Sequence, residues 1–281
     1  MHSSEIISKI ELKANLLRQD IINMLCHSGS GHPGGSLSAT DIVATLYFHV
    51  LKHDPQNPKD ENRDRFVMSK GHAAPLLYAA LAECGYFPKE ELLKLRQTGA
   101  LLQGHIDMHS VPGIDMSTGS LGQGLSVANG MAIAGKLNKK DYRVYALLGD
   151  GECQEGQVWE AAMTAAHYKL DNLIAFVDFN EHQIDGRVSD IKNIEPLDKK
   201  FESFNWKVFK CDGHSVEEIL SAIEVAKLVK GAPSVIIART VKGKGVSFME
   251  EAPLNYHGKA PTKEERERAM AQLCKVVFKN D

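Results

Sequence analysis

Hydrophobic residues recur three and four positions apart over residues 7–25, which predicts an amphipathic helix near the start of the chain. The following segment, residues 29–36, reads GSGHPGGS and is expected to be a loop, because it holds four glycines and a proline. A second amphipathic helix is predicted over residues 38–51, with Ser38 and Asp41 as a capping pair.

Short apolar segments then alternate with helical patterns. Strands are expected at residues 65–69, 143–148, 173–179, 207–210 and 234–238. Helices are expected at residues 75–83, 121–136, 157–168 and 216–228, and a charged amphipathic helix without an assigned partner surface at 262–279. This alternation predicts an α/β fold in three layers, a parallel sheet flanked by helices. Ligands of such sheets bind at the carboxyl ends of the strands.

Composition agrees with a folded α/β protein. Hydrophobic residues make up 43% and charged residues 25% of the 281 positions, which is close to globular averages. No repeat or linker divides the chain, so residues 1–281 are expected to form a single domain.

Charge and cysteine content narrow the classes of function. The net charge of −3 leaves no basic excess to hold a polyanion, which argues against a nucleic-acid binder. No apolar run approaches the ~20 residues that span a bilayer, and the first residues lack the pattern of a signal peptide. The five cysteines are scattered without a CxxC pair, which indicates a reducing compartment. We therefore expect a cytoplasmic protein with no membrane and no nucleic-acid partner.

Two polar side chains follow neighbouring predicted strands. Asp150 lies between two glycines directly after the strand at 143–148, and Asn180 follows the strand at 173–179. The carboxyl ends of parallel strands share one edge, so a carboxylate and an amide oxygen are expected to meet there. Such oxygens suit Mg²⁺, which shares its coordination sphere with phosphate oxygens and water. Gly151 leaves room for a diphosphate near the amino end of a helix.

These motifs resemble those of a known family. GDGECQEG and VDFNEHQIDG resemble the thiamine diphosphate signature. SGSGHPGGS, RFVMSKGHA, GHIDMHSVPGIDMSTGSLGQGLS and HGKAP resemble the amino-terminal, diphosphate-binding domain of transketolases. The resemblance extends from about residue 12 to residue 261, with the motifs in family order. It implies a thiamine diphosphate-binding fold and an enzyme that transfers a two-carbon ketol group from a ketose phosphate to an aldose phosphate.

The resemblance also implies a cofactor and a metal site. The cofactor is thiamine diphosphate with Mg²⁺, for which Ca²⁺ or Mn²⁺ can substitute. The implied metal ligands are the side chains of Asp150 and Asn180 and the backbone carbonyl of His182. The implied cofactor contacts are His72, Gly119, Ser120, Leu121, Gly151, Asn180, Ile184 and His257. Judged from the residues alone, Ile184 is equally well a core residue and Ser120 a helix cap.

Four histidines lie in glycine-flanked loops. They are His32, His72, His105 and His257. Imidazole can hydrogen-bond sugar hydroxyls or diphosphate oxygens and can exchange protons near neutral pH. The resemblance implies that His72 and His257 contact the diphosphate and that His32, His105 and His257 contact substrate. The other histidines, His182 apart, are expected to be structural or solvent-facing.

Three further charged residues have two interpretations each. Glu155 matches the family's glutamate in a carboxylate network that joins the two active sites of a dimer, and it also suits the amino end of a helix. Lys242 and Lys244 follow the last predicted strand, where they either neutralise phosphate or occupy a solvated turn. The resemblance implies that Glu155 is catalytic together with His32, His72, His105 and His257.

Enzymes of this family need a second domain, which supplies a glutamate to the cofactor's pyrimidine ring and arginines to sugar phosphates. Neither that pyrimidine-binding domain nor the family's C-terminal domain has room within 281 residues. The chain is therefore expected to be the N-terminal subunit of a split transketolase of the pentose phosphate pathway, active only with a C-terminal subunit. A heterotetramer, α₂β₂, is the simplest closed assembly.

Alternative functions stay open. One is a related thiamine diphosphate enzyme with another sugar donor, similar to 1-deoxyxylulose-5-phosphate synthase or acting on a sulfosugar or unusual sugar. Another is a non-catalytic cofactor-binding domain, which would have no need of four loop histidines. The alpha subunits of 2-oxo acid dehydrogenase complexes lack the SGHPGG and SKGHA patterns. A nicotinamide dehydrogenase is disfavoured because no GxGxxG opens a helix after the first strand.

Overall fold

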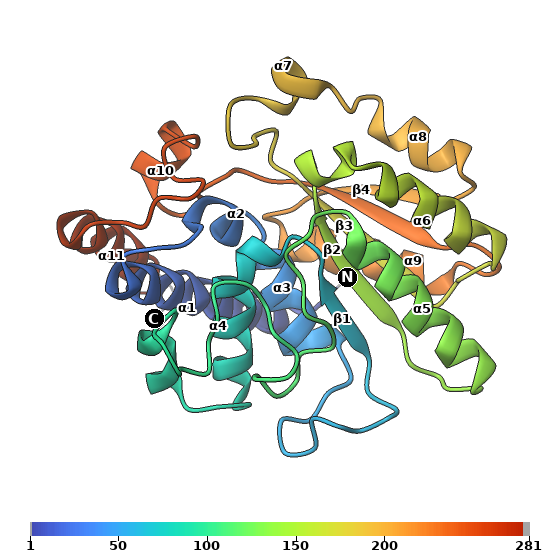
Figure 1. Ribbon diagram of the computed structural model, residues 1–281, viewed down its shortest axis with the longest axis horizontal. Coiled ribbons are helices and arrows are strands. Elements are labelled where there is room, and N and C mark those ends of the chain that lie inside the picture. The colour runs from blue at the N-terminus through green and yellow to red at the C-terminus, as the bar shows by residue number, and fades with distance from the viewer. Residues whose placement is uncertain (1, 278–281) are drawn as a thin grey trace.

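A computed structural model describes residues 2–277 of the chain (Figure 1). Five strands form one sheet in the order β1-β2-β3-β5-β4. Their bounds are β1 (Arg65–Met68), β2 (Val144–Gly149), β3 (Leu173–Phe179), β4 (Lys207–Asp212) and β5 (Ser234–Arg239). Every pairing in the sheet is parallel. The alternating pattern of the sequence predicted this arrangement, and the structure confirms it.

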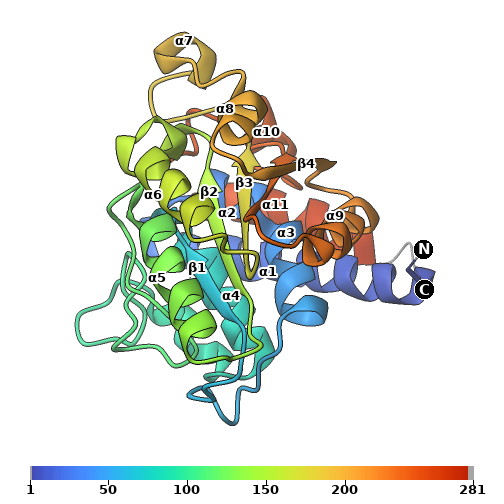
Figure 2. The same cartoon turned by 90° about the vertical axis from the view of Figure 1, so that its right-hand side faces the viewer.

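Helices cover both faces of the sheet, which makes three layers (Figure 2). One face carries α1 (Ser4–Ser28), α2 (Pro33–Ser38), α3 (Thr40–Thr45), α4 (Ala74–Cys84) and α9 (Val216–Leu228). The other carries α5 (Gln123–Leu137), α6 (Gly156–His167) and α8 (Leu197–Ser203). Successive residues of β2 alternate between the two cores, with Tyr145 and Leu147 in one and Ala146 and Leu148 in the other. This double coverage explains why the central strands are apolar at nearly every position.

Shorter elements complete the chain. They are the π-helical turn Leu46–Val50, the 3₁₀ turns Gly71–Ala73, Lys89–Lys94 and Gly151–Gln154, and the helices α7 (Val188–Lys192) and α10 (Ser247–Glu251). Strand β4 lies at the edge of the sheet, and its two lysines and Asp212 are exposed. Charged residues on an edge strand discourage pairing with another sheet.

The first glycine-rich segment differs from its prediction. Residues 29–36 were expected to form a loop, but α2 begins within them at Pro33. Proline suits the first position of a helix, because no intrahelical partner exists there for an N–H group. The helix expected over residues 38–51 is likewise interrupted at Ala39, and its last turn is π-helical. Packing of these turns against the site, described below, overrides the local periodicity.

The predicted capping pair is also wrong. Ser38 is the last residue of α2, and its hydroxyl donates to Asp178 Oδ2 at 2.6 Å. Asp41 accepts a hydrogen bond from Arg18 Nη2 at 2.5 Å instead of capping a helix. Both residues are buried, and partners from distant parts of the chain satisfy them better than the local backbone would.

The last helix, α11 (Lys263–Val277), packs along α1 (Figure 1). Leu273 is 1% exposed, and its carbonyl accepts a hydrogen bond from Asn15 Nδ2 at 3.0 Å. The helix that the sequence predicted is thus confirmed and its partner surface identified, while residues 278–279 of that prediction lie outside the described residues. Among residues 2–277, no helix combines the length and the apolar character needed to cross a bilayer.

Candidate active site

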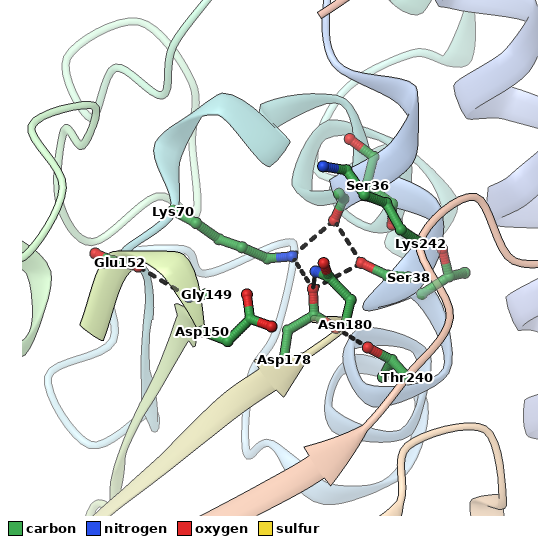
Figure 3. A network of polar contacts seen from close by, with 12 residues as sticks. Ser36, Ser38, Lys70, Gly149, Asp150, Glu152, Asp178, Asn180, Thr240 and Lys242 are labelled. Atoms are coloured by element: carbon green, nitrogen blue, oxygen red, sulfur yellow. Dashed lines mark hydrogen bonds and ion pairs between the residues drawn. The ribbon is translucent and has the colours of Figure 1, made fainter. Parts of the chain in front are cut away.

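Asp150 and Asn180 lie close together at the carboxyl edge of the sheet (Figure 3). Asp150 follows β2 and Asn180 follows β3, and these two strands pair directly, with Gly149 opposite Asp178. Both residues are buried, with 2% of Asp150 and 8% of Asn180 exposed. The structure therefore confirms the adjacency that the strand pattern predicted.

Asp150 is a buried carboxylate with little charge compensation. It accepts hydrogen bonds from the backbone N–H groups of Gly151 at 2.7 Å and Glu181 at 2.5 Å. Burial raises the pKa of Asp150 to about 7, and the nearby charge of Asp178 adds to the rise. A bound cation would favour the ionised form of such a group, so the environment of Asp150 fits a metal ligand.

Asn180 lies beside Asp150 with a side-chain oxygen, and the His182 carbonyl lies 3.3 Å from Lys242 Nζ. Asn180 Nδ2 donates to Asp178 Oδ2 at 2.9 Å, and its Oδ1 accepts from His182 N at 3.1 Å. The His182 ring turns back on its own chain, where Nδ1 donates to the Asn180 carbonyl at 2.8 Å. In residues 2–277, no group of three or more His, Cys, Asp or Glu side chains is placed to hold a metal ion. A carboxylate, an amide and a backbone carbonyl remain as donors, and oxygens of these kinds suit Mg²⁺.

A buried ion pair lies next to Asp150 and Asn180 (Figure 3). Lys70 Nζ lies 2.6 Å from Asp178 Oδ2, and the two side chains are 2% and 0% exposed. Ser38 and Thr240 hydroxyls also donate to Asp178, at 2.6 and 2.5 Å. Burial alone would raise the pKa of Asp178, but the charge of Lys70 and these hydrogen bonds hold it below its usual range. Asp178 is therefore ionised, and it fixes the positions of Lys70, Ser38 and Thr240 next to the site.

The Lys70–Asp178 pair was not predicted from the sequence. A signal for it existed, because Asp178 lies inside a predicted buried strand and Lys70 directly follows another one. A charged residue in such a position needs a partner. Local patterns do not reveal which partner, because the two residues are 108 positions apart.

Glu152 is a second buried anchor that was not predicted from the sequence. Its carboxylate accepts hydrogen bonds from Ser69 Oγ at 2.5 Å, Gly122 N at 2.9 Å and Gly149 N at 3.0 Å. These three donors belong to the turns after β1, before α5 and at the end of β2. One side chain thus holds together three turns that line the site.

The structure brings the four loop histidines together. Ring centroids are 5.2 Å apart for His32 and His72, 5.6 Å for His32 and His257, and 6.5 Å for His32 and His105. The rings of His72 and His257 are 5.5 Å apart. Gly119 allows the approach of His105, because a Cβ atom at this position would lie 3.2 Å from His105 Cδ2, closer than an ordinary contact.

Three rings of the histidine cluster are uncharged at neutral pH. Burial, followed by the charge of Arg96, lowers the pKa of His32 to about 4. Burial and the charge of Lys242 lower the pKa of His257 to about 3, and burial with Lys70 holds the pKa of His72 well below its usual value. His32 Nδ1 is buried and has no hydrogen-bond partner among residues 2–277. An unpartnered buried nitrogen of this kind fits a site that receives a polar ligand.

Lys242 lies inside the site. The residue is 2% exposed, and Nζ contacts the carbonyls of His182 and Gln183 at 3.3 Å and His257 Nδ1 at 2.8 Å. Burial lowers the pKa of this ammonium to about 8. The solvated-turn interpretation is therefore wrong for Lys242. Lys244 is half-buried and holds the loop through its backbone carbonyl, which accepts from Arg18.

The remaining expected cofactor contacts lie on the rim. Ser120 and Leu121 are exposed, and Ser120 is not a helix cap, because Gly122 occupies the position before α5. Ile184 is 65% exposed, so the alternative of an ordinary core residue is wrong. Gly151 opens a 3₁₀ turn, where a Cβ atom would lie 3.3 Å from Gln183 Cβ.

Glu155 lies outside this cluster. It occupies the position before the first residue of α6, is exposed, and makes no side-chain capping hydrogen bond. Its Cβ lies 2.8 Å from the Cβ that Gly122 would carry, which shows how tightly this turn packs. The helix-end interpretation therefore agrees with its position, and in the part of the chain that the structure describes its side chain makes no capping hydrogen bond.

Comparisons with known proteins give one consistent result. The family model described as "Transketolase, thiamine diphosphate binding domain" matches residues 10–275. The chain is 48% identical over 266 residues to the 6-deoxy-6-sulfo-D-fructose transketolase subunit SqwG of Clostridium sp. (strain MSTE9), and the match covers 95% of this chain and 96% of that one. It is 42% identical to an apulose-4-phosphate transketolase subunit of Actinobacillus succinogenes, with coverage of 94% and 96%.

A solved structure agrees. The transketolase of Campylobacter jejuni superimposes with a TM-score of 0.90 at 36% sequence identity. This match covers 97% of the present chain but only 43% of that transketolase. The chain thus spans less than half the length of the solved structure that it matches, and nearly all the length of the two subunits.

Proposed function

The chain belongs to the transketolase family, to its thiamine diphosphate-binding domain, and from this we propose that it is the N-terminal subunit of a split transketolase. With a C-terminal subunit it would transfer a two-carbon ketol group from a ketose to an aldose. One observation carries this function: four loop histidines gather beside the carboxylate and amide that end β2 and β3. The end-to-end similarity to two chains named as transketolase subunits supports it.

The proposed metal ligands are Asp150 Oδ, Asn180 Oδ1 and the His182 carbonyl, with Mg²⁺ as the ion and Ca²⁺ or Mn²⁺ as substitutes. The two side chains are already oriented by hydrogen bonds to neighbouring backbone N–H groups. Such support by outer partners is typical of ligands that hold a cation. The ion would offset the negative charge of both Asp150 and a diphosphate.

The proposed cofactor is thiamine diphosphate, which when bound supplies the carbon nucleophile that carries the two-carbon unit. Lys242 is buried at this edge without a carboxylate within 4.0 Å in the described part of the chain, so its charge is available to a diphosphate. The proposed contacts are His72, Gly119, Ser120, Leu121, Gly151, Asn180, Ile184 and His257. Their positions around the edge of β2 and β3 are consistent with this role.

The loop histidines would bind the hydroxyl groups of the sugar substrate. Because burial keeps His32 and His257 neutral, each ring can donate from one nitrogen and accept at the other. We assign His32, His105 and His257 to sugar hydroxyls and to proton transfer, and His72 and His257 to the diphosphate. With pKa values of about 4 and 3 the free rings of His32 and His257 are weak bases, so proton transfer would require a bound diphosphate, whose negative charge raises the pKa of a nearby imidazole.

The substrate class has two candidates. A ketose phosphate donor and an aldose phosphate acceptor, as in the pentose phosphate pathway, follow from the family. A sulfosugar donor is the second candidate, and the 48% identity to a sulfofructose transketolase subunit favours it specifically. Turnover of a sugar phosphate and of a 6-sulfonated ketose by the same reconstituted enzyme would separate the two.

The partner and setting form the last part of the proposal. A pyrimidine-binding chain would complete each active site, and two such pairs would assemble as α₂β₂ with Glu155 near the two-fold axis. All five cysteines are unpaired, which is consistent with the reducing cytoplasm. The exposed, uncommitted Glu155 carboxylate suits a surface that meets another chain.

The central experiment is reconstitution. We expect the purified chain alone to show no ketol transfer, because the glutamate that activates the cofactor belongs to the other domain. Mixing with a transketolase chain that contains the pyrimidine-binding domain should restore turnover, measured as sugar interconversion. Full activity of the isolated 281-residue chain would contradict the split-subunit proposal.

A further inference from the structure

A series of hydrogen bonds runs from the buried Arg18–Asp41 pair to an exposed backbone N–H of the loop that carries Lys242. The Val241 N–H donates to His214 Nε2 at 2.8 Å, and His214 Nδ1 lies 2.8 Å from Asp41 Oδ2. Asp41 Oδ2 also accepts from Arg18 Nη2 at 2.5 Å. The Arg18, Asp41 and His214 side chains are 10%, 8% and 12% exposed. We call these three residues the Arg18–Asp41–His214 series.

The partners of His214 determine its tautomer. A backbone N–H can only donate, so Nε2 must carry the lone pair, and the ring proton is on Nδ1, where it donates to Asp41. Burial would raise the pKa of Asp41, but the charge of Arg18 and the hydrogen bonds from His214 and Arg18 hold it below its usual value. The His214 imidazole thus accepts a hydrogen bond at Nε2 and donates one from Nδ1, so both ring nitrogens have a partner.

Arg18 also contacts the same loop directly. Its Nε donates to the Lys244 carbonyl at 3.2 Å while Nη2 is bonded to Asp41. The loop is therefore held at Val241 on one side of Lys242 and at Lys244 on the other. Arg18 comes from α1, Asp41 from α3 and His214 from the turn between β4 and α9, so three elements distant in sequence converge on one loop.

The held backbone decides where the Lys242 ammonium points. A lysine stem is flexible, so its direction depends on where the backbone starts and what encloses the stem. Here the stem passes Gly34, where a Cβ atom would lie only 3.0 Å from Lys242 Cγ, and Gly243 N donates to the Gly34 carbonyl at 3.1 Å. Nζ then reaches His257 Nδ1 at 2.8 Å. A shift of the loop backbone would move the ammonium away from the site.

We propose that the Arg18–Asp41–His214 series positions Lys242 for the site, through the backbone at Val241 and Lys244. The three are positioning residues, because they act through the loop and not on the reacting atoms. The link from loop position to a diphosphate rests on the proposed function. The positioning of the loop itself stands on these contacts alone.

Two substitutions of His214 separate its two hydrogen bonds. In His214→Asn the shorter amide can still meet Asp41 but does not reach the Val241 N–H. In His214→Gln the longer side chain can place an oxygen where Nε2 accepts that N–H. His167→Asn, at an exposed position of α6, is the matched control. Circular dichroism of each variant confirms the native fold before comparison.

The first measurement needs no cofactor. Amide hydrogen exchange over residues 240–244 and acetylation of Lys242, followed by mass spectrometry, are compared in the full chain. We expect His214→Asn to speed both about tenfold, which is the order of effect of one lost hydrogen bond, while His214→Gln and His167→Asn stay near wild type. Unchanged exchange and labelling in His214→Asn would overturn the positioning role, as would equal changes in the asparagine and glutamine variants.

The second measurement is calorimetric titration of the full chain with thiamine diphosphate and Mg²⁺. We expect binding by His214→Asn to be about tenfold weaker than wild type, with rescue in His214→Gln. Equal affinity in the two variants, despite faster labelling of Lys242, would overturn the link between loop position and ligand. If the wild-type chain and its reconstituted complex both failed to bind this cofactor, the proposed function would fall, while the labelling result would still decide the loop positioning.

Discussion

At the scale of single residues, the site combines groups that are costly to bury with groups that are kept neutral. Asp150 is 2% exposed and faces another carboxylate, Asp178, which already has Lys70 as its counter-ion. Burial first, and then the positive charges of Arg96 and Lys242, keep His32 and His257 uncharged. Both arrangements raise the free energy of the site when it holds no ligand. A ligand that brings positive charge to Asp150 and hydrogen-bonding atoms to the histidines would lower it.

A pair of substitutions tests the metal ligands. Asp150→Asn and Asn180→Ala should weaken cofactor binding by about a hundredfold or more, since substitution of even the outer partners of a metal ligand costs roughly 10–100-fold. His182→Ala should keep binding, because only its backbone carbonyl is proposed as a ligand. Cofactor titration in the presence of Mg²⁺ measures all three, and the proposal predicts the same losses when the metal is chelated.

The free chain supplies a control for these substitutions. In Asp150→Asn the gain from removing a buried charge is opposed by an amide N–H that faces one of the two backbone donors, so we expect little net change in the melting temperature of the cofactor-free chain. A cofactor loss that merely followed a lower melting temperature would indicate damage to the fold. Loss of metal binding in His182→Ala with an intact fold would contradict the backbone-carbonyl assignment.

The neutral histidines predict a dependence of stability on pH. The pKa of His32 is about 4 in the folded chain, against an ordinary value of 6.5. Between pH 6.5 and pH 4 the His32 ring is therefore protonated in the unfolded chain but not in the folded chain. As a result, the free energy of unfolding decreases as the pH drops from 6.5 toward 4. The expected contribution of His32 is about 1 kcal/mol between about pH 7 and pH 5, after discounting for its partial exposure. Urea unfolding at several pH values measures it.

The control for this pH effect is His32→Gln, which cannot take up the proton. Its stability should fall less between about pH 7 and pH 5 than that of the wild-type chain. Identical pH profiles for the two proteins would show that the folded chain accepts the proton at His32 after all.

At the scale of secondary structure elements, turns that are remote in sequence depend on shared side chains. Glu152 joins the turns after β1, before α5 and at the end of β2, and all three of its partners are donors. Asp178 likewise ties α2 to the residue after β5 through the hydroxyls of Ser38 and Thr240. The strands supply a rigid edge, and these carboxylates hold the turns on it.

Glu152→Gln tests this linkage. An amide at this position points one N–H group at a backbone donor, so we expect a loss of about 1–3 kcal/mol in the free energy of unfolding. Denaturant unfolding measures it, with Glu160→Gln on the exposed side of α6 as the control, for which almost no change is expected. Equal stability of the two variants would show that the turns hold their places without Glu152.

At the scale of the whole molecule, the proposed site is buried on one side and exposed on the other. The polar edge, the histidine cluster and Lys242 come from this chain, while Ser120, Leu121 and Ile184 on its rim are exposed. The C. jejuni transketolase, of which this chain matches 43%, is more than twice as long as the match. These facts fit a subunit whose exposed rim meets a second chain.

The assembly can be tested directly. Native mass spectrometry of the reconstituted enzyme should show two chains of each kind, and titration should show two cofactors per particle. Glu155→Gln should weaken activity or the coupling between sites more than it lowers the melting temperature of the single chain, because its exposed carboxylate makes no capping hydrogen bond within that chain. A fully active 1:1 complex that is unaffected by Glu155→Gln would contradict the two-fold interface.

The sequence by itself determined the layers and the polar carboxyl edge of the sheet. Short apolar runs between amphipathic helices specify strands buried on both faces, and residues that follow two such strands must meet where parallel strands end. For this reason the meeting of Asp150 and Asn180 could be predicted from the strand pattern, whereas the gathering of the four glycine-flanked histidines around one site rested on the family resemblance. The extent of each helix near the site was less predictable, since Ala39 interrupts the run that periodicity assigned to one helix.

Only the tertiary structure decided which polar groups pair. Lys70 with Asp178, Asp41 with both Arg18 and His214, and Lys242 with the carbonyl of His182 are contacts between distant segments. Local patterns reveal that a buried charge needs a partner, but the partner is whichever group the packing of helices and strands brings within hydrogen-bond distance. That distance depends on the whole fold, and the sequence around each residue does not contain it.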